Sequence, residues 1–215
     1  METLVTFLRL VLLSMVPFVL ASQGTMLGGR TGIFNVAQEG IMLLGASLGF
    51  LVSYQVGNNF VGMLAAMAAG ALFGLLLAYF TTTLKMNQFV IGLSLFFIGV
   101  GLSTLLPKLV IGITLSPPLI PTLPEVSIPV LSQIPLLGPI LFKQNGLVYF
   151  SIILSLGLWY FLYRTQRGLE LRAVGENPMA ADSLGINTVS ARYWTAIAGG
   201  ALIGLAGAYL PMVYT

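Results

Sequence analysis

Charged side chains are scarce in this chain of 215 residues, and nearly half of them lie in one stretch. The chain has nine basic and six acidic residues, and seven of these fifteen fall between residues 164 and 192. Burying those seven in lipid costs on the order of 20 kcal/mol, at about 3 kcal/mol for each charge. The stretch 164–192 must therefore lie in water or against another protein.

The rest of the chain is apolar enough to exclude an ordinary soluble domain. Hydrophobic residues make up 57% of the sequence and charged residues 7%. About 20 apolar residues cross a bilayer as a helix, so we predict one all-α, polytopic transmembrane bundle of about six spans over residues 1–215. The expected spans are 3–21, 37–54, 60–80, 88–106, 146–163 and 193–215. A cleaved signal peptide is an alternative for the first run, but the acidic Glu2 argues against it.

Three of the expected spans carry small residues at every fourth position. The strips are Gly45, Gly49 and Ser53; Ala66, Gly70, Gly74 and Ala78; and Ala196, Gly200, Gly204 and Ala208. Small residues at this spacing let helix backbones approach closely in a membrane. We expect all three strips to pack helix against helix.

Two segments interrupt the spans. Residues 22–35 are rich in glycine and predict a polar connector, whereas eight prolines between 107 and 145 forbid a continuous helix there. Four arginines and no lysine flank the stretch 164–192, and the positive-inside rule places such a loop in the cytoplasm. Residues 107–145 are then an extracytoplasmic loop, the Arg30 connector and Lys85 turn are cytoplasmic, and the N-terminus is outside.

The charged stretch contains signs of a short helix. Asn177 and Pro178 suit a helix start, and Gly185 suits the left-handed residue that closes one. We predict a helix from Pro178 to Leu184. Met179 and Leu184 would offer apolar contact, and Ala180 with Ala181 would let a partner's surface come close.

This stretch also resembles a known family. Residues 168–187 read Gly-Leu-Glu-Leu-Arg-Ala-Val-Gly-Glu-Asn-Pro-Met-Ala-Ala-Asp-Ser-Leu-Gly-Ile-Asn, which is similar to the cytoplasmic coupling loop of permease subunits of bacterial ABC importers. The resemblance implies that residues 165–190 carry a coupling helix that docks on an ATPase. The residues assigned to coupling are Gly168, Arg172, Gly175, Glu176, Asn177, Pro178, Ala180, Ala181 and Gly185.

A second motif of the same family begins at Gly32 and runs to Ala46. In relatives this helix lies near the translocation path, so the resemblance makes Asn35, Gln38, Glu39 and Met42 candidates for the path. On a continuous helix these positions share a face. In the alternative, Glu39 sits among lipid headgroups within reach of Arg30. Asn87 and Gln88 either line the path or cap the following helix.

Substrate choice depends on resemblance alone. Residues 131–142 look like the corresponding loop of the branch that carries nucleosides and simple sugars. The resemblance therefore makes nucleosides the first expected substrate and simple sugars the second. Branched-chain amino acids are the alternative. Phe34, Phe89, Phe96 and Phe97 could stack on a base. Relatives continue for several more helices, so the sequence resembles an N-terminal portion of a permease.

The resemblance implies several partners and a location in the inner, cytoplasmic membrane. No phosphate-binding Gly-x-x-x-x-Gly-Lys-Ser/Thr motif occurs, so ATP and Mg²⁺ are expected on a separate ATPase subunit and no cofactor or enzyme activity on this chain. A second permease, an extracytoplasmic substrate-binding lipoprotein and membrane lipid complete the implied set. The net charge of +3 does not indicate nucleic acid, and a chain without Cys or His predicts no metal site.

Two other classes remain as alternatives. An ion-coupled secondary transporter should display inverted repeats and mid-span charges, and neither is evident. Gly45 to Gly49 spells the Gly-x-Ser-x-Gly pattern of serine hydrolases, but the chain has no histidine base. Only Lys85, Lys108 and Lys143 could replace it.

Overall fold

The computed structural model describes residues 2–112, 119–127 and 140–213, and its framework is six long helices. All six are long and apolar enough to cross a membrane, as the sequence predicts. They are α1 (Glu2–Gly29), α2 (Gln38–Val56), α3 (Asn59–Ala78), α4 (Gln88–Val110), α6 (Gly146–Arg164) and α9 (Thr188–Val213). The all-α, polytopic fold class is confirmed.

Shorter elements join these helices. A π-helical turn, η1 (Tyr79–Thr83), extends α3, and two short helices, α7 (Gln166–Glu176) and α8 (Pro178–Ser183), lie between α6 and α9. Strand β1 (Glu125–Ser127) pairs antiparallel with β2 (Lys143–Asn145), with Val126 opposite Gln144. The pairing holds the end of the long loop near the start of α6.

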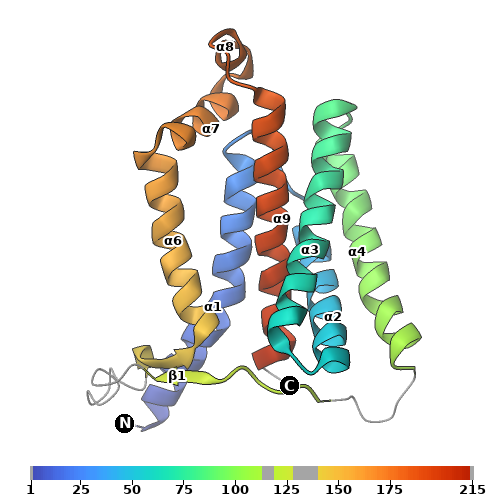
Figure 1. The fold of residues 1–215 in the computed structure, drawn as a ribbon, viewed down its shortest axis with the longest axis vertical. Helices are drawn as coiled ribbons and strands as arrows, with labels where there is room; N and C mark the ends of the chain where they lie inside the picture. The colour runs from blue at the N-terminus through green and yellow to red at the C-terminus, as the bar shows by residue number, and fades with distance from the viewer. Residues whose placement is uncertain (1, 113–118, 128–139, 214–215) are drawn as a thin grey trace.

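Helix α9 is the centre of the bundle and packs against α1, α2 and α3 (Figure 1). A Cβ on Gly204 would overlap the Ala66 carbonyl of α3, and one on Gly45 of α2 would overlap the Gly204 carbonyl. Gly70 meets Gly200 in the same way. The three strips of small residues therefore face one another across α9, which confirms their packing role.

The helix ends divide into two sets at opposite ends of the bundle. The α1–α2 connector, the α3–α4 turn and α7–α8 share one end, whereas both termini lie at the other (Figure 1). This alternation matches the predicted order of crossings, with the N-terminus opposite the charged loop. We call the α7–α8 end the loop end; its cytoplasmic location remains the prediction of the positive-inside rule.

Helix α1 continues well past its predicted end at residue 21. The Ser22 and Thr25 hydroxyls donate to carbonyls of their own helix, Val19 O at 2.9 Å and Ala21 O at 3.1 Å, so these polar residues do not interrupt it. Gly24 packs backbone to backbone against Gly199 of α9. The predicted connector of residues 22–35 is thus wrong in its first eight residues, because tertiary contact overrides the poor helix propensity of glycine.

Proline likewise fails to end α4, which continues three residues beyond Pro107 to Val110. Much of the proline-rich loop, including most of the family-like segment 131–142, lies outside the described residues. Its described part packs on the bundle: the Leu123 N–H donates to the Met212 carbonyl at 3.0 Å, and Ile120 is buried against Ala208 and Met212.

Candidate functional site

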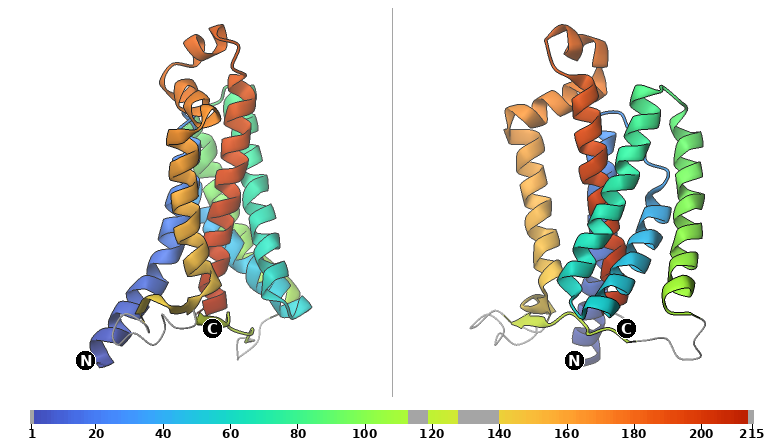
Figure 2. Two further views of the ribbon diagram at one scale, coloured as in Figure 1. Left: turned by 60° about the vertical axis from the view of Figure 1, so that its left-hand side comes forward. Right: turned by 45° about the vertical axis from the view of Figure 1, so that its right-hand side comes forward.

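The charged loop folds into two helices rather than one. Figure 2 shows α8 projecting beyond the loop-end turns of the other helices. Sequence reasoning treated residues 165–176 as part of a loop and missed α7, although most of its residues favour helices. Gly168 and Gly175, which lower helix propensity, obscured the pattern.

Helix α7 begins in a tight corner with α6. The Thr165 hydroxyl caps it by accepting from the Gly168 N–H at 3.1 Å and donates to the Phe161 carbonyl at 2.6 Å. A Cβ at Gly168 would overlap that same carbonyl. Gly168 is therefore required for the corner itself.

The far end of α7 is fixed to the α1–α2 connector. Gly175 lies directly on the Arg30 carbonyl, where no Cβ fits. The Arg172 guanidinium carbon sits 4.9 Å from the ring centre of Tyr163, and Arg30 donates to the Tyr163 hydroxyl at 2.7 Å. We call Tyr163, Arg30 and Arg172 the tyrosine clamp, because one ring of α6 holds cations from the connector and from α7.

The connector is in turn fixed to α9 and α4. Arg192 Nε donates to the Thr31 carbonyl at 3.1 Å, and the buried Thr31 and Thr195 hydroxyls lie 2.7 Å apart. The Gln88 amide accepts from the Phe34 N–H at 2.8 Å and donates to the Gly32 carbonyl at 3.1 Å. Sequence reasoning missed Tyr163, Thr31 and Thr195, whose roles depend on contacts between residues more than 130 positions apart.

Helix α8 forms where its residues predict. The Asn177 side chain accepts from the Ala180 N–H at 3.1 Å, Pro178 occupies the first turn, and Gly185 has a φ of 82°. The helix ends at Ser183, one residue before the predicted end. The predicted cap and left-handed closure are confirmed.

The apolar side chains of α8 point away from the protein. Met179 is 83% exposed, and Leu184, which directly follows the helix, is 81% exposed. Ala180 is exposed as well, but Ala181 is 2% exposed and faces its own chain. The expectation that both alanines face a partner is therefore wrong for Ala181, whose methyl group packs α8 onto the loop.

The acidic side chains of the loop are not neutralised by nearby cations. Glu176 ends α7 with an exposed side chain, and no acidic residue of the loop forms an ion pair with another described residue. Arg172 is held by the Tyr163 ring rather than by a carboxylate. The loop end therefore presents both signs of charge around the apolar tip of α8.

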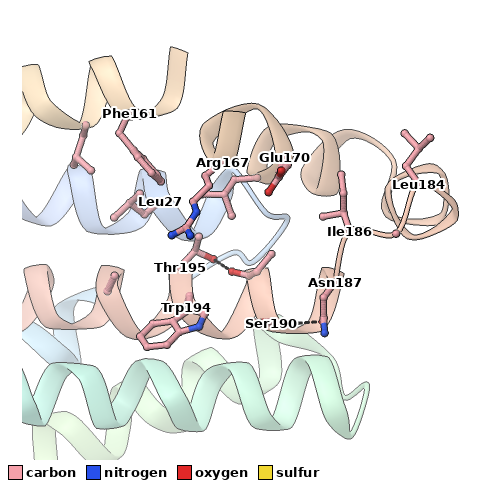
Figure 3. A pocket seen from close by; sticks show the side chains of 15 residues that line it. Leu27, Phe161, Arg167, Glu170, Leu184, Ile186, Asn187, Ser190, Trp194 and Thr195 are labelled. Carbon is pink, nitrogen blue, oxygen red and sulfur yellow. Dashed lines mark hydrogen bonds between the residues drawn. The ribbon is translucent and has the colours of Figure 1, made fainter. Parts of the chain in front are cut away.

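A hollow of about 680 Å³ lies beneath this loop, between α7 and α9 (Figure 3). Leu27, Phe161 and Trp194 give it an apolar floor. Its rim is polar, with Arg167 and Glu170 from α7 and Asn187, the residue before α9. Helices α7 and α9 are joined through the connector but stand apart along this space.

The second family motif is not a continuous helix. Asn35 precedes α2, and its side chain accepts from the Ala37 N–H at 3.0 Å, so it does not share a helical face with Gln38, Glu39 and Met42. Met42 is half-buried and packs against two core clusters; its assignment to the path stays a prediction. Gln38 is half-buried and Glu39 is exposed.

Glu39 lies well below the start of α4 along the bundle. Its neighbour Gly40 packs on the backbone of Phe96, eight residues into α4, which is about 12 Å below the start of that helix at 1.5 Å per residue. No ion pair joins Glu39 to Arg30, whose guanidinium bonds Tyr163. Glu39 lies in the first turn of α2, so the expectation that no acidic residue lies mid-span stays a prediction.

Asn87 and Gln88 are structural in the described chain. Asn87 caps α4 by accepting from the Phe89 and Val90 N–H groups at 2.9 and 3.3 Å, and both ends of the Gln88 amide hold the connector. The capping alternative for Asn87 is the one observed.

The hydrolase alternative finds no support in the described residues. The Ser47 hydroxyl is buried and has no hydrogen-bond partner, so no base is placed to activate it. Gly45 and Gly49 on either side pack against α9. The Gly-x-Ser-x-Gly pattern here is part of a packing strip.

Comparison with known proteins identifies the family. The family model described as the permease component of branched-chain amino acid transport systems matches residues 6–215. The chain is 33% identical over 200 residues to a putative glucose ABC transporter permease of Haloferax volcanii, covering 91% of this chain and 59% of that protein. No solved structure matches.

Two further relatives are named for nucleosides. The guanosine ABC transporter permease of Bacillus subtilis is 34% identical over 201 residues, with 89% of this chain and 62% of that protein covered. The nucleoside ABC transporter permease of Lactococcus lactis is 34% identical over 204 residues, with the same coverage of 89% and 62%. The chain thus spans about 60% of the length of these relatives. Six apolar helices and a family match along nearly its whole length show that this multi-pass membrane protein belongs to the permease-component family of ABC transport systems.

Proposed function

We propose that this chain forms the membrane path of an ATP-driven importer for nucleosides, with simple sugars as the second choice of cargo. Energy comes from hydrolysis of ATP, which binds together with Mg²⁺ to a separate ATPase subunit. A second permease and an extracytoplasmic binding lipoprotein complete the transporter. The names of the relatives support the choice of cargo.

One observation carries the coupling role. Helix α8 exposes Met179 and Leu184 almost completely, at 83% and 81%, on the outermost part of the molecule (Figure 2). Large apolar side chains gathered at an exposed tip mark a contact site for another protein. Helix α8 is proposed to insert this tip into a groove of the ATPase.

The contacts of α7 supply the mechanical link. Movement of α8 passes to α7, and α7 is fixed at Gly168 to α6 and at Gly175 to the connector. The connector bonds α9 through Thr31 and Arg192. Movement of α8 is therefore transmitted to α6, α1 and α9 together. Such a movement is a rigid-body conformational change.

The test is uptake by the complete transporter in membrane vesicles. Labelled guanosine, glucose and leucine are compared with and without ATP, with the ATPase, second permease and binding protein present. Guanosine or glucose uptake that needs ATP supports the proposal. ATP-dependent uptake of leucine alone would reassign the cargo, and uptake that persists without an ATPase would overturn the ATP-driven mechanism.

A further inference from the structure

A second pocket, of about 400 Å³, lies between the loop-end part of α1 and the start of α2. Ser22 and Thr25 line it from α1, and Phe34, Asn35 and Gln38 line it from the connector and α2. Its volume falls within the roughly 300–1,000 Å³ of small-molecule sites. Five of its lining residues are thus polar or aromatic, although its α1 side belongs to a segment, Val5–Gly29, that is long and apolar enough to cross a membrane.

The pocket extends along the loop-end part of α1. Its residues on α1 run from Ser22 to Gly29, about 10 Å of helix at 1.5 Å per residue. The connector beside it is non-helical over residues 33–35. Backbone of this kind occurs at membrane depth only where it is buried in protein or lines a water-filled cavity, and Phe34 is 69% exposed. The pocket is therefore best explained as water-accessible.

Its polar groups are suited to hydroxyls. The side-chain NH₂ groups of Asn35 and Gln38 donate to no described residue. The Ser22 and Thr25 hydroxyls use their hydrogens within α1, which leaves their oxygens as acceptors. Free donors and free acceptors thus line one space, an arrangement that matches hydroxyl groups, since each both donates and accepts.

The pocket also lacks charge. None of its lining residues is ionisable, and Arg30 beside it is turned toward Tyr163. A zwitterionic amino acid or a phosphorylated ligand would lose hydration there without a compensating charge. Phe34 offers an aromatic face on which a flat or partly apolar ring can rest.

We propose that this pocket binds a neutral polyhydroxylated ring, the furanose of a nucleoside or the pyranose of a simple sugar, on the loop-end side of the path. The inference depends on the proposed function and assigns part of the path to Ser22, Thr25, Asn35 and Gln38. Gln38 is the principal donor, and Phe34 is the stacking surface.

The chain has no cysteine, so single cysteines can be labelled without background. Thr25→Cys and Gln38→Cys are compared with Phe97→Cys, a 63% exposed position on α4 outside the pocket. A charged, hydrophilic maleimide is applied to inside-out vesicles holding the complete transporter. We expect labelling at positions 25 and 38 at least ~10-fold faster than at 97, because only the pocket is wet.

Protection by ligand then identifies the occupant. Guanosine, glucose or both should slow labelling at positions 25 and 38 at least ~3-fold. Protection by guanosine indicates a furanose, and protection by glucose indicates a pyranose. Leucine should have no effect on labelling. Absence of labelling, absence of protection by either ring, or protection by leucine alone would each overturn the proposal.

A transport measurement separates this inference from the proposed function. Gln38→Leu should raise the KM for uptake about tenfold, equivalent to about 1.4 kcal/mol, whereas Gln55→Leu at the far end of α2 should leave it unchanged. Normal ATP-dependent uptake with an unaltered KM in Gln38→Leu would contradict the pocket assignment and leave the proposed function intact. A wild-type transporter that takes up neither guanosine nor glucose would instead contradict the proposed function.

Discussion

Helices α7 and α8 adjoin in the sequence but differ in how they are held. Helix α7 is fixed at both ends, by Gly168 against α6 and by Gly175 against the connector, with Val174 fully buried. Helix α8 contacts its own chain mainly through Ala181 and exposes its larger apolar side chains. In the proposed coupling, α7 is the rigid part that transmits movement, and α8 is the exposed part that binds the ATPase.

This contrast predicts the largest effect at Gly175. Gly175→Leu must displace the Arg30 backbone, and overpacking of this kind costs about 1–3 kcal/mol. We expect uptake to fall by at least ~20-fold and the unfolding temperature to drop. The control is Gly157→Leu in α6, where a Cβ meets nothing within 4 Å. Equal uptake by the two variants would show that α7 is not held as described.

Changes at the tip of α8 should separate coupling from stability. Met179→Asp and Leu184→Asp place a charge in the proposed apolar contact, and we expect about tenfold weaker binding of the ATPase, or about 1.4 kcal/mol. Thermal unfolding of the purified permease should not change, because both side chains are exposed. Leu84→Asp, a 49% exposed site in the α3–α4 turn, is the control. Unchanged ATPase binding in the α8 variants would remove α8 from the interface.

The tyrosine clamp predicts a smaller loss. Tyr163→Phe removes one hydrogen bond, about 1 kcal/mol, and Tyr163→Leu also removes the ring beneath Arg172, for a total of about 2 kcal/mol. Denaturant unfolding measures both. The same changes at Tyr160, a 60% exposed residue of α6, serve as controls. Matching losses at the two positions would mean that the clamp contributes nothing.

The smallest effects concern the ends of α8. Gly185→Ala forces alanine to adopt a φ of 82°, and Asn177→Ala removes the helix cap; each should cost about 1 kcal/mol. Hydrogen exchange of the α8 amides should quicken about fivefold. Gly101→Ala in α4, where no atom lies within 4 Å of the added Cβ, should not alter exchange in α8. Slower or unchanged exchange in the Asn177 variant would argue against the cap.

Sequence predicted the helices well because apolar runs of membrane length leave few alternatives. Apart from the missed α7, its errors occur at helix ends: Ser22 and Thr25 satisfy their hydroxyls on their own helix, and α4 continues past Pro107. Propensity alone argues for an earlier stop in both places. The tertiary contact of Gly24 with Gly199 explains the first error.

The parts of the candidate site that depend on local backbone preferences could be predicted from the sequence. The parts that depend on contacts between residues distant in the sequence could not. Asn177, Pro178 and Gly185 specify α8 through their own backbone preferences. The clamp around Tyr163 joins residues 133 positions apart, and the non-helical connector before α2 is held by the Gln88 amide, more than 50 positions away. Neither follows from spacing, because only the fold brings those partners together.

The most direct test of the coupling account is a crosslink from the exposed position 180. Ala180→Cys, in a chain without other cysteines, is modified with a photoactivatable maleimide in membranes that hold the complete transporter. The account predicts a crosslinked product containing the ATPase subunit, formed when the reagent enters from the cytoplasmic side. A product without the ATPase, or labelling of the introduced cysteine by an impermeant reagent from the outer side, would contradict it.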